Sequence, residues 1–191
     1  MARNTPALDL LRTRRSAALS TLAAPGPGET DLQTILTLAA RVPDHAKLIP
    51  WRFIVIAGVA KEKLRESIAI AFASSNPGST PAQLADAGAK LGNAPVTIAV
   101  VISPKSHPKV PEIEQTLSAG AVCMNMLIVA KALGFGAVWL TEWFAFNRGV
   151  LSTLGVAEHE KLAGFIHIGT EPVPREDRPR PELRQIVTTF A

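Results

Sequence analysis

Cysteine is almost missing from this chain, and that absence limits its class. The 191 residues contain one cysteine, Cys123, so no internal disulfide framework can form. A chain without disulfides fits a reducing compartment. Cys123 lies in the apolar stretch AVCMNMLIVA, which predicts a small buried side chain and no nucleophilic role.

Long uninterrupted apolar runs are also missing. The N-terminal segment MARNTPALDLLRTRRS has no apolar core and carries Asp9 early, which argues against a secretory signal. The longest helical candidate, 111–136, is interrupted by Asn125 and Lys131, and its apolar run falls short of the roughly 20 residues that span a bilayer. We therefore predict a cytoplasmic protein without a membrane segment.

Several motifs of catalysis and binding are absent. GFGAVW follows a helical stretch and lacks a third glycine, so the dinucleotide fingerprint is missing. No GxxxxGK[ST] loop, GxSxG elbow or HExxH pair occurs. The histidines stand far apart without ligand spacing, so we expect no metal site, and we interpret His167 in FIHIG as a satisfied core or strand-face histidine. No recognition-helix, zinc-finger or aromatic-platform signature supports sequence-specific nucleic-acid binding.

The composition indicates a globular chain. Apolar residues make up 47% of the sequence and charged residues 19%, as in ordinary folded domains. This length supports one sizeable core, so we predict a single domain over 1–191. The formal net charge of +4 permits an anionic cofactor or partner without choosing among them.

The hydrophobic pattern predicts both helices and strands. A first helix begins near residue 5 and ends in the basic cluster RTRRS, and a second is capped at Thr30 or Asp31. The β-branched run in 94–103 predicts a central strand that is buried on both faces. The other predicted helices are 59–75, 82–92, 111–136 and 147–156, and the other predicted strands are 51–58, 137–143 and 162–171.

Small residues mark the middle of the longest helix, 111–136, which we interpret as a buried core helix. Ser118, Ala119, Gly120 and Ala121 leave room for another helix to approach closely, which suggests a dimer seam. After Thr170 the composition becomes proline-rich and charged. Two interpretations of this tail stay open, an extended segment lying on a partner subunit and a frayed terminus.

The stretch ARVPDHAKLIPWRF, residues 40–53, gathers potential cations in one short segment. Arg41, His45, Lys47 and Arg52 lie around Pro43 and Pro50 and beside an aromatic side chain. Prolines restrict the backbone and disfavour helix in the residue before them. The stretch therefore resembles a preorganised anion site. For Arg41 the plainer role of capping a helix end stays open, and Pro50 and Trp51 equally fit a strand start that fills core.

Arg14, Arg15 and Ser16 follow the first predicted helix. Guanidinium groups beside a hydroxyl suit a phosphate dianion. Taken alone, such a cluster is more often a solvated helix end.

Four stretches in the same order resemble the FMN-dependent nitroreductase family, in particular its short YdjA-like branch. They are RRS at 14–16, AARVPDHAKLIPWRFIVI at 39–56, LSAG at 117–120 and GFGAVW at 134–139. The resemblance implies an α+β fold with a mixed central sheet flanked by helices. It also implies a homodimer joined through long central helices and exchanged terminal segments, with FMN bound at the interface by both chains.

Carried over residue by residue, the resemblance implies that Arg14, Arg15 and Ser16 hold the FMN phosphate and ring edge. Arg41 and His45 match residues that reach FMN across the dimer interface. Trp139, Leu140 and Thr141 match the strand end along the isoalloxazine ring. Leu140 stands where relatives often carry a polar or basic residue, which leaves the substrate face open. The tail arginines 175, 178, 180 and 184 are not assigned to the site.

The implied activity is transfer of hydride from NADH or NADPH through FMN to a nitroaromatic, quinone or similar small acceptor. FMN would carry the chemistry, so no side chain is assigned as a catalytic acid or base. Two rivals stay open. One is a specialised flavin enzyme acting on a particular metabolite or on the flavin itself, and the other is a non-catalytic FMN-binding protein.

Overall fold

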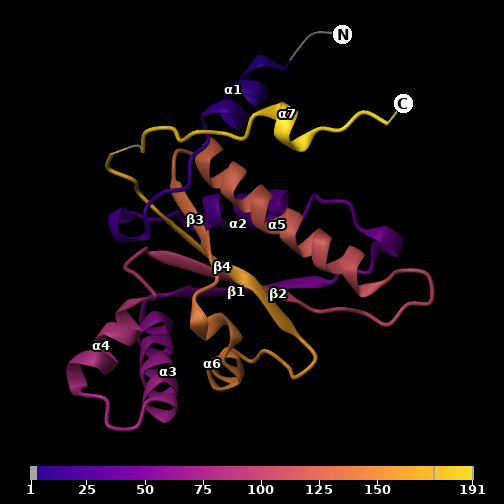
Figure 1. Cartoon of the computed structure of the whole chain (residues 1–191). Helices are drawn as coiled ribbons and strands as arrows, with labels where there is room; N and C mark the ends of the chain where they lie inside the picture. Colours follow the sequence, from indigo (N-terminus) through magenta and orange to yellow (C-terminus); the bar gives the residue numbers. More distant parts are fainter. Residues whose placement is uncertain (1–3, 174, 191) are drawn as a thin grey trace.

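A computed structural model describes residues 4–173 and 175–190, in which an antiparallel sheet lies between two groups of helices (Figure 1). Helices α2 and α5 cover one face of the sheet, and α3, α4 and α6 lie on the other side. The elements are α1 Thr5–Thr13, α2 Glu29–Ala39, β1 Trp51–Ala57, α3 Val59–Ser75, α4 Pro81–Ala89, β2 Val96–Ile102, α5 Glu112–Ala132, β3 Gly136–Leu140, α6 Arg148–Thr153, β4 Lys161–Gly169 and α7 Leu183–Ile186. The α+β class is confirmed.

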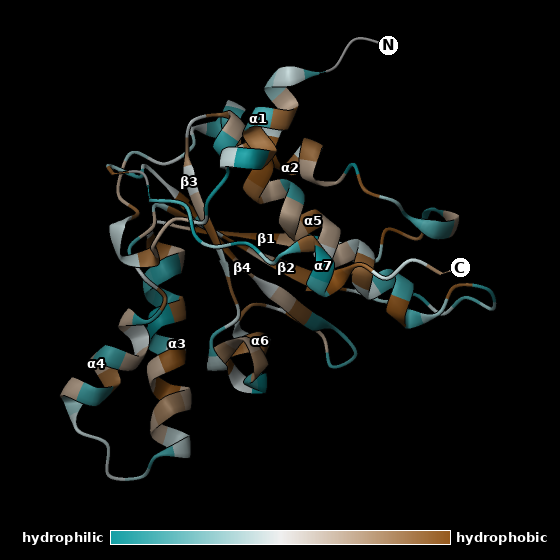
Figure 2. Cartoon of the chain, turned by 45° about the horizontal axis from the view of Figure 1, so that its top comes forward, coloured by the Kyte–Doolittle hydropathy of each residue, from teal (hydrophilic) through white to brown (hydrophobic). Residues whose placement is uncertain are grey.

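The central strands are apolar on both faces. Every residue of β2 is buried, which confirms the predicted central strand. Ile98 and Val100 pack with α2 and α5, whereas Ala99 and Val101 pack with α3 and α6. Successive side chains of a strand point to opposite faces, so one strand supplies both cores. Figure 2 shows β1 and β2 and much of α5 in the hydrophobic colour.

The predicted mixed sheet is wrong for the strands that the structure describes. Their order is β1-β2-β4-β3, and each neighbouring pair is antiparallel. Helix α5 carries the chain from β2 to β3, and these two strands run in the same direction because both start opposite the end of β4. However, β4 lies between them and pairs antiparallel with each, so the crossover creates no parallel pair.

The helices α3 and α4 form an excursion that leaves and rejoins the sheet at one edge. Ala57 at the end of β1 pairs with Val96 at the start of β2. The chain therefore returns beside its exit point, and β2 runs antiparallel to β1. A capping box starts α4: the backbone N–H of Gln83 donates to the Thr80 hydroxyl, and the backbone N–H of Thr80 donates to the Gln83 side-chain oxygen.

Two predicted helix details differ in the structure. Helix α2 begins at Glu29 with Gly28 as its N-cap, so Thr30 and Asp31 lie in its first turn and cap nothing. Helix α5 has 21 residues and is long and apolar enough to cross a membrane by length and composition, against the shorter run we expected. Its buried face, which includes Val122 and Met126, packs in the core beside α2 and the sheet.

Candidate functional site

Arg14, Arg15 and Ser16 lie in an extended segment after α1. Arg14 is the C-cap of α1, and its backbone N–H donates to the carbonyl of Leu10 at 2.9 Å. The backbone N–H of Ala17 then donates to the carbonyl of Ala137 in β3 at 3.0 Å. The basic segment is thereby docked at the start of β3, close to where α5 ends.

The guanidinium of Arg14 lacks part of its hydrogen bonding. Its Nη1 is buried and has no hydrogen-bond partner among the described residues. Burial lowers the pKa of Arg14, and the charges of Arg180, Arg15 and Arg178 lower it further. A buried donor without an acceptor costs about 1–3 kcal/mol. An anion at this point would supply the acceptor and offset the repulsion among the arginines.

The C-terminal tail contributes two of these arginines. Arg15 Nε donates to the backbone carbonyl of Glu176 at 3.0 Å and lies 3.6 Å from Asp177 Oδ1. The tail is therefore held against the basic segment, which brings Arg178 and Arg180 close enough to act on Arg14. Sequence reasoning left both unassigned. The alternation of arginine and proline in RPRP was the available signal, but the contact joins segments 161 residues apart.

Trp139 and Leu140 are the last two residues of β3, and Thr141 follows them. Trp139 Nε1 donates to the carbonyl of Ala163 at 3.0 Å, and the residue is 37% exposed. The indole can take this position only because residue 164 is glycine. A Cβ at Gly164 would lie 2.2 Å from Trp139 Nε1 and would clash with it. Leu140 packs against a small cluster that includes Ala17, and Thr141 is exposed.

Arg41 and His45 belong to a loop on the exposed side of α5. Asn125 Nδ2 donates to the carbonyl of Arg41 at 3.1 Å, and Ser118 Oγ donates to that of Pro43 at 2.8 Å. His45 Nδ1 lies 2.8 Å from Glu114 Oε2. The Arg41 side chain is exposed. The loop therefore lies along α5, with His45 beside its first turn.

The backbone of this loop is strained. Ala46, Lys47 and Ile49 have φ values of 59°, 56° and 49°, in the left-handed region that β-branched residues such as isoleucine rarely adopt. Asp44 holds this shape, because its Oδ1 accepts from Leu48 N at 3.1 Å and its Oδ2 from Ile49 N at 2.9 Å. Strain that is held in place by specific contacts is typical of functional sites.

A hollow of about 280 Å³ lies between the loop and α5. Pro43, His45, Glu114, Leu117, Ser118 and Ala121 line it. Ser118 Oγ is engaged with the carbonyls of Pro43 and Glu114. The polar side-chain chemistry of the hollow therefore rests on His45 and Glu114.

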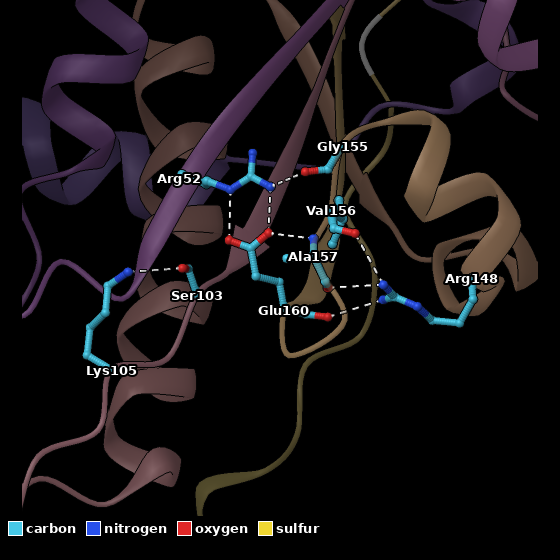
Figure 3. Close-up of polar contacts among 8 residues, drawn as sticks. All are labelled: Arg52, Ser103, Lys105, Arg148, Gly155, Val156, Ala157 and Glu160. Atoms are coloured by element: carbon cyan, nitrogen blue, oxygen red, sulfur yellow. Dashed lines mark hydrogen bonds and ion pairs between the residues drawn. The ribbon is translucent and has the colours of Figure 1, made fainter.

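The predicted anion site in 40–53 is wrong for Arg52. Arg52 Nε and Nη2 donate to the two carboxylate oxygens of Glu160 at 2.8 and 2.5 Å, and Nη2 also reaches the carbonyl of Gly155 (Figure 3). This pairing lowers the pKa of the buried Glu160 to about 2. Arg52 is therefore paired with a carboxylate 108 residues away in sequence, and this pairing accounts for its charge without a ligand.

The core interpretations of two further residues are confirmed. His167 is buried, and its Nδ1 lies 3.0 Å from Thr97 Oγ1. Burial lowers the pKa of His167 to about 4, so its ring is neutral near pH 7. Cys123 is also buried, and burial raises the pKa of its thiol to about 12, which makes it a poor nucleophile.

Two groups of predicted site residues lie toward opposite ends of α5. Arg14, Arg15 and Ser16 are near its C-terminal end, and His45 is at its N-terminal turn. Arg41 lies between them beside Asn125, and Trp139–Thr141 are at the far end of β3, where Trp139 bonds Ala163. With 21 residues, α5 is about 30 Å long. One chain therefore does not bring all of these residues to a single point.

An apolar stripe on α5 connects the two groups. Ile113 and Leu117 are 61% and 65% exposed, and Gly120, Ala121, Met124 and Ile128 continue the stripe at helical spacing. Ala119 instead faces the core. Large apolar side chains exposed along one helix face are typical of an interaction surface.

Comparison with known proteins agrees with this architecture. The sequence profile of the nitroreductase family matches residues 11–170. The protein named "Putative NAD(P)H nitroreductase YdjA" from Escherichia coli K12 is 38% identical over 167 residues, which cover 86% of this chain and 87% of that protein.

Solved structures share the fold. A "Nitroreductase-like Family Protein" from Bacillus cereus has a TM-score of 0.83 at 20% identity, covering 100% of this chain and 98% of that one. A "putative nitroreductase in complex with fmn" from Desulfovibrio desulfuricans has a TM-score of 0.73 at 22% identity, covering 100% and 99%. Since the family profile and the Escherichia coli relative both span most of the sequence, the chain belongs to the nitroreductase family.

Proposed function

We propose that the chain is an FMN-dependent oxidoreductase that takes hydride from NAD(P)H and reduces nitroaromatic, quinone or similar small acceptors. Two comparisons support this: one relative carries the name NAD(P)H nitroreductase, and one solved neighbour contains FMN. Bound FMN supplies the redox chemistry, and the protein binds it, orients it and excludes water.

The observation that carries the proposal is the orphaned donor of Arg14. Its buried Nη1 faces no acceptor within the described residues, and Arg15, Arg178 and Arg180 surround it with positive charge. A phosphate monoester dianion fits both observations. Its oxygens accept hydrogen bonds from the guanidinium of Arg14, and its negative charge offsets the repulsion among the arginines. These arginines and Ser16 would hold the phosphate of FMN.

The end of β3 would lie along the flavin ring. Trp139 presents a partly exposed aromatic surface that is fixed by its hydrogen bond to Ala163, and Leu140 follows it with its own side chain packed against the Ala17 cluster. Thr141 follows as an exposed polar residue. An apolar slot with a few polar groups is typical of cofactor sites. We expect acceptors and NAD(P)H to use the same open face in turn.

A cytoplasmic homodimer would complete the site. In a two-fold dimer that pairs α5 with its copy antiparallel, the His45 end of one helix lies beside the Arg14 end of the other. The exposed stripe with Leu117 would then be buried, and Arg41 and His45 would reach the FMN held by the partner chain. The separation of the two residue groups along one helix supports this arrangement.

The absorbance spectrum and mass of the purified protein test the proposal together with Arg14→Gln. We expect a flavin band near 450 nm, binding of added FMN and a dimer mass, with FMN affinity falling at least tenfold in Arg14→Gln. A monomer that binds no FMN would contradict the proposal.

Reduction by NAD(P)H separates an enzyme from a flavin-binding protein. We expect NADH or NADPH to bleach bound FMN much faster than free FMN in stopped-flow measurements, followed by reoxidation by a panel of quinones and nitroaromatics. Equal rates for bound and free FMN would leave the chain a non-catalytic binder. Turnover with oxygen alone would point to a specialised flavin enzyme.

A further inference from the structure

We infer that Glu114 is a positioning residue for His45 at the flavin site. The inference rests on the proposed function, because it concerns the histidine that would reach the partner's FMN. The contact itself is direct, with His45 Nδ1 2.8 Å from Glu114 Oε2.

The carboxylate determines which nitrogen carries the proton. An ionised carboxylate only accepts hydrogen bonds, so the partner nitrogen Nδ1 must be the donor. Glu114 is in the first turn of α5, where the positive end of the helix dipole favours negative charge. With Nδ1 donating to Glu114, Nε2 becomes the ring nitrogen left for a ligand. Nε2 accepts when the ring is neutral and donates when the ring is protonated.

The loop presents the ring to α5 in one orientation. The left-handed residues Ala46 and Lys47 follow His45 directly, and Asp44 fixes the turn by accepting from Leu48 N and Ile49 N. Ser118 Oγ joins the loop to α5 through the carbonyl of Pro43. Because the loop backbone is already held, what the Glu114 contact adds is to fix the rotation and the tautomer of the imidazole ring.

The pair has little value for stability alone. The His45 and Glu114 side chains are 55% and 46% exposed, so solvent screens the attraction between them. The His45–Glu114 pair lines the hollow together with Leu117 and Ala121, which suggests a role in ligand binding. A dimer would cover this hollow, and inside it a ring held in one tautomer becomes a preorganised contact.

A double-mutant cycle with His45→Ala and Glu114→Ala tests the inference. If Glu114 acts through His45, each single variant weakens FMN binding by about tenfold and the double variant is no worse than His45→Ala. Glu114→Gln keeps an acceptor for Nδ1–H and should restore most of the affinity. Glu112→Gln is the matched control, because Glu112 lies in the same turn and pairs instead with Lys161 at 2.8 Å.

Imidazole NMR gives a readout that needs no cofactor. We expect the ¹⁵N signals of His45 in the FMN-free protein to show Nδ1 protonated and Nε2 unprotonated at high pH, and to average between tautomers in Glu114→Ala. Unchanged signals in Glu114→Ala, or additive losses of FMN affinity in the cycle, would overturn the inference. If the parent protein binds FMN through Arg14 while Glu114→Ala binds it equally well, the inference fails and the proposed function stands. If the parent binds no FMN, both fail.

Discussion

At the scale of single residues, Gly164 determines where Trp139 can lie. Its φ of 151° and the 2.2 Å approach of Trp139 Nε1 to a built Cβ leave no room for a side chain. The neighbouring Leu140 carbonyl would stand 2.9 Å from the same Cβ. The shape of the proposed ring slot therefore depends on a residue that contributes no side chain to it.

We expect Gly164→Ala to displace the indole of Trp139 and break its hydrogen bond to Ala163. Overpacking and a disallowed φ together should lower the free energy of unfolding by about 1–3 kcal/mol. Chemical denaturation and tryptophan fluorescence would measure the change, and FMN affinity should fall with it. Gly28→Ala is the comparison, because Gly28 has a φ of −70° and open space around its Cβ position, so only its N-cap role is lost, at a cost below about 1 kcal/mol. Equal stability of the two variants would contradict this account.

Glu160 gives the fold an acid-sensitive contribution. Its pKa of about 2 lies below the ordinary 4.5, so the folded state binds fewer protons than the unfolded state between these values. The stability from the Arg52 pair is therefore complete above pH 4.5 and is lost as the pH falls toward 2. We expect this pH-dependent contribution to the free energy of unfolding to be about 2 kcal/mol, reduced from the full value because the Arg52 side chain is partly exposed.

Glu160→Gln should remove this contribution. We expect a lower free energy of unfolding at pH 7 and a flatter decline between pH 5 and about 2, measured by urea denaturation across the range. Glu112→Gln serves for comparison, because the Glu112–Lys161 pair has exposed side chains. An acid decline in Glu160→Gln as steep as in the parent would show that other carboxylates dominate.

At the scale of elements, α5 has one face in the core, and on its other side Ile113 and Leu117 remain exposed within the described part of the chain. We expect Leu117→Glu to dissociate the proposed dimer, because two-fold symmetry would bury a carboxylate in each copy of an apolar seam. Light scattering after size exclusion would report the mass. Val59→Glu, at the start of α3 on the other side of the sheet and 86% exposed, should leave the mass unchanged. A Leu117→Glu protein that keeps a dimer mass would place the seam elsewhere.

Local patterns predicted the elements better than their pairing. The β-branched run of β2 and the periodicity of α5 are properties of neighbouring residues, so they could be read from sequence. The insertion of β4 between β2 and β3 could not, because strand order depends on which chain segments meet in space. The same reason explains why the sequence misled for Arg52. The residues around it resemble a ligand site, but its partner Glu160 comes from a loop 108 residues away.

The site residues divide along the same line. The resemblance named Arg14 and His45, and the structure adds surroundings consistent with a ligand, an orphaned donor for Arg14 and a carboxylate for His45. Arg178 and Arg180 depend on a tail contact that no local pattern encodes. Their assignment to a phosphate site remains a proposal.

At the scale of the whole molecule, a phosphate site at the arginine cluster would link ligand binding to stability. FMN at one hundred times its dissociation constant should add about 2.7 kcal/mol to the stability, which corresponds to a rise in Tm of about 5–10 °C for a chain of this size. Differential scanning fluorimetry would measure it, with potassium chloride at matched ionic strength as control. Arg14→Gln should lose most of the shift, and a full shift in that variant would move the phosphate site away from Arg14.

The α3–α4 excursion has a practical consequence. Because it leaves after Ala57 and returns opposite that residue at Val96, the register of the sheet does not depend on the length of the connection between its helices. Residues 76–78 of the turn are exposed, and Gly78 has open space around its Cβ position. A peptide tag or a reporter domain inserted in that turn would thus lie on the side of the sheet away from α5, so we expect it to leave the proposed flavin site and the proposed pairing of two copies undisturbed.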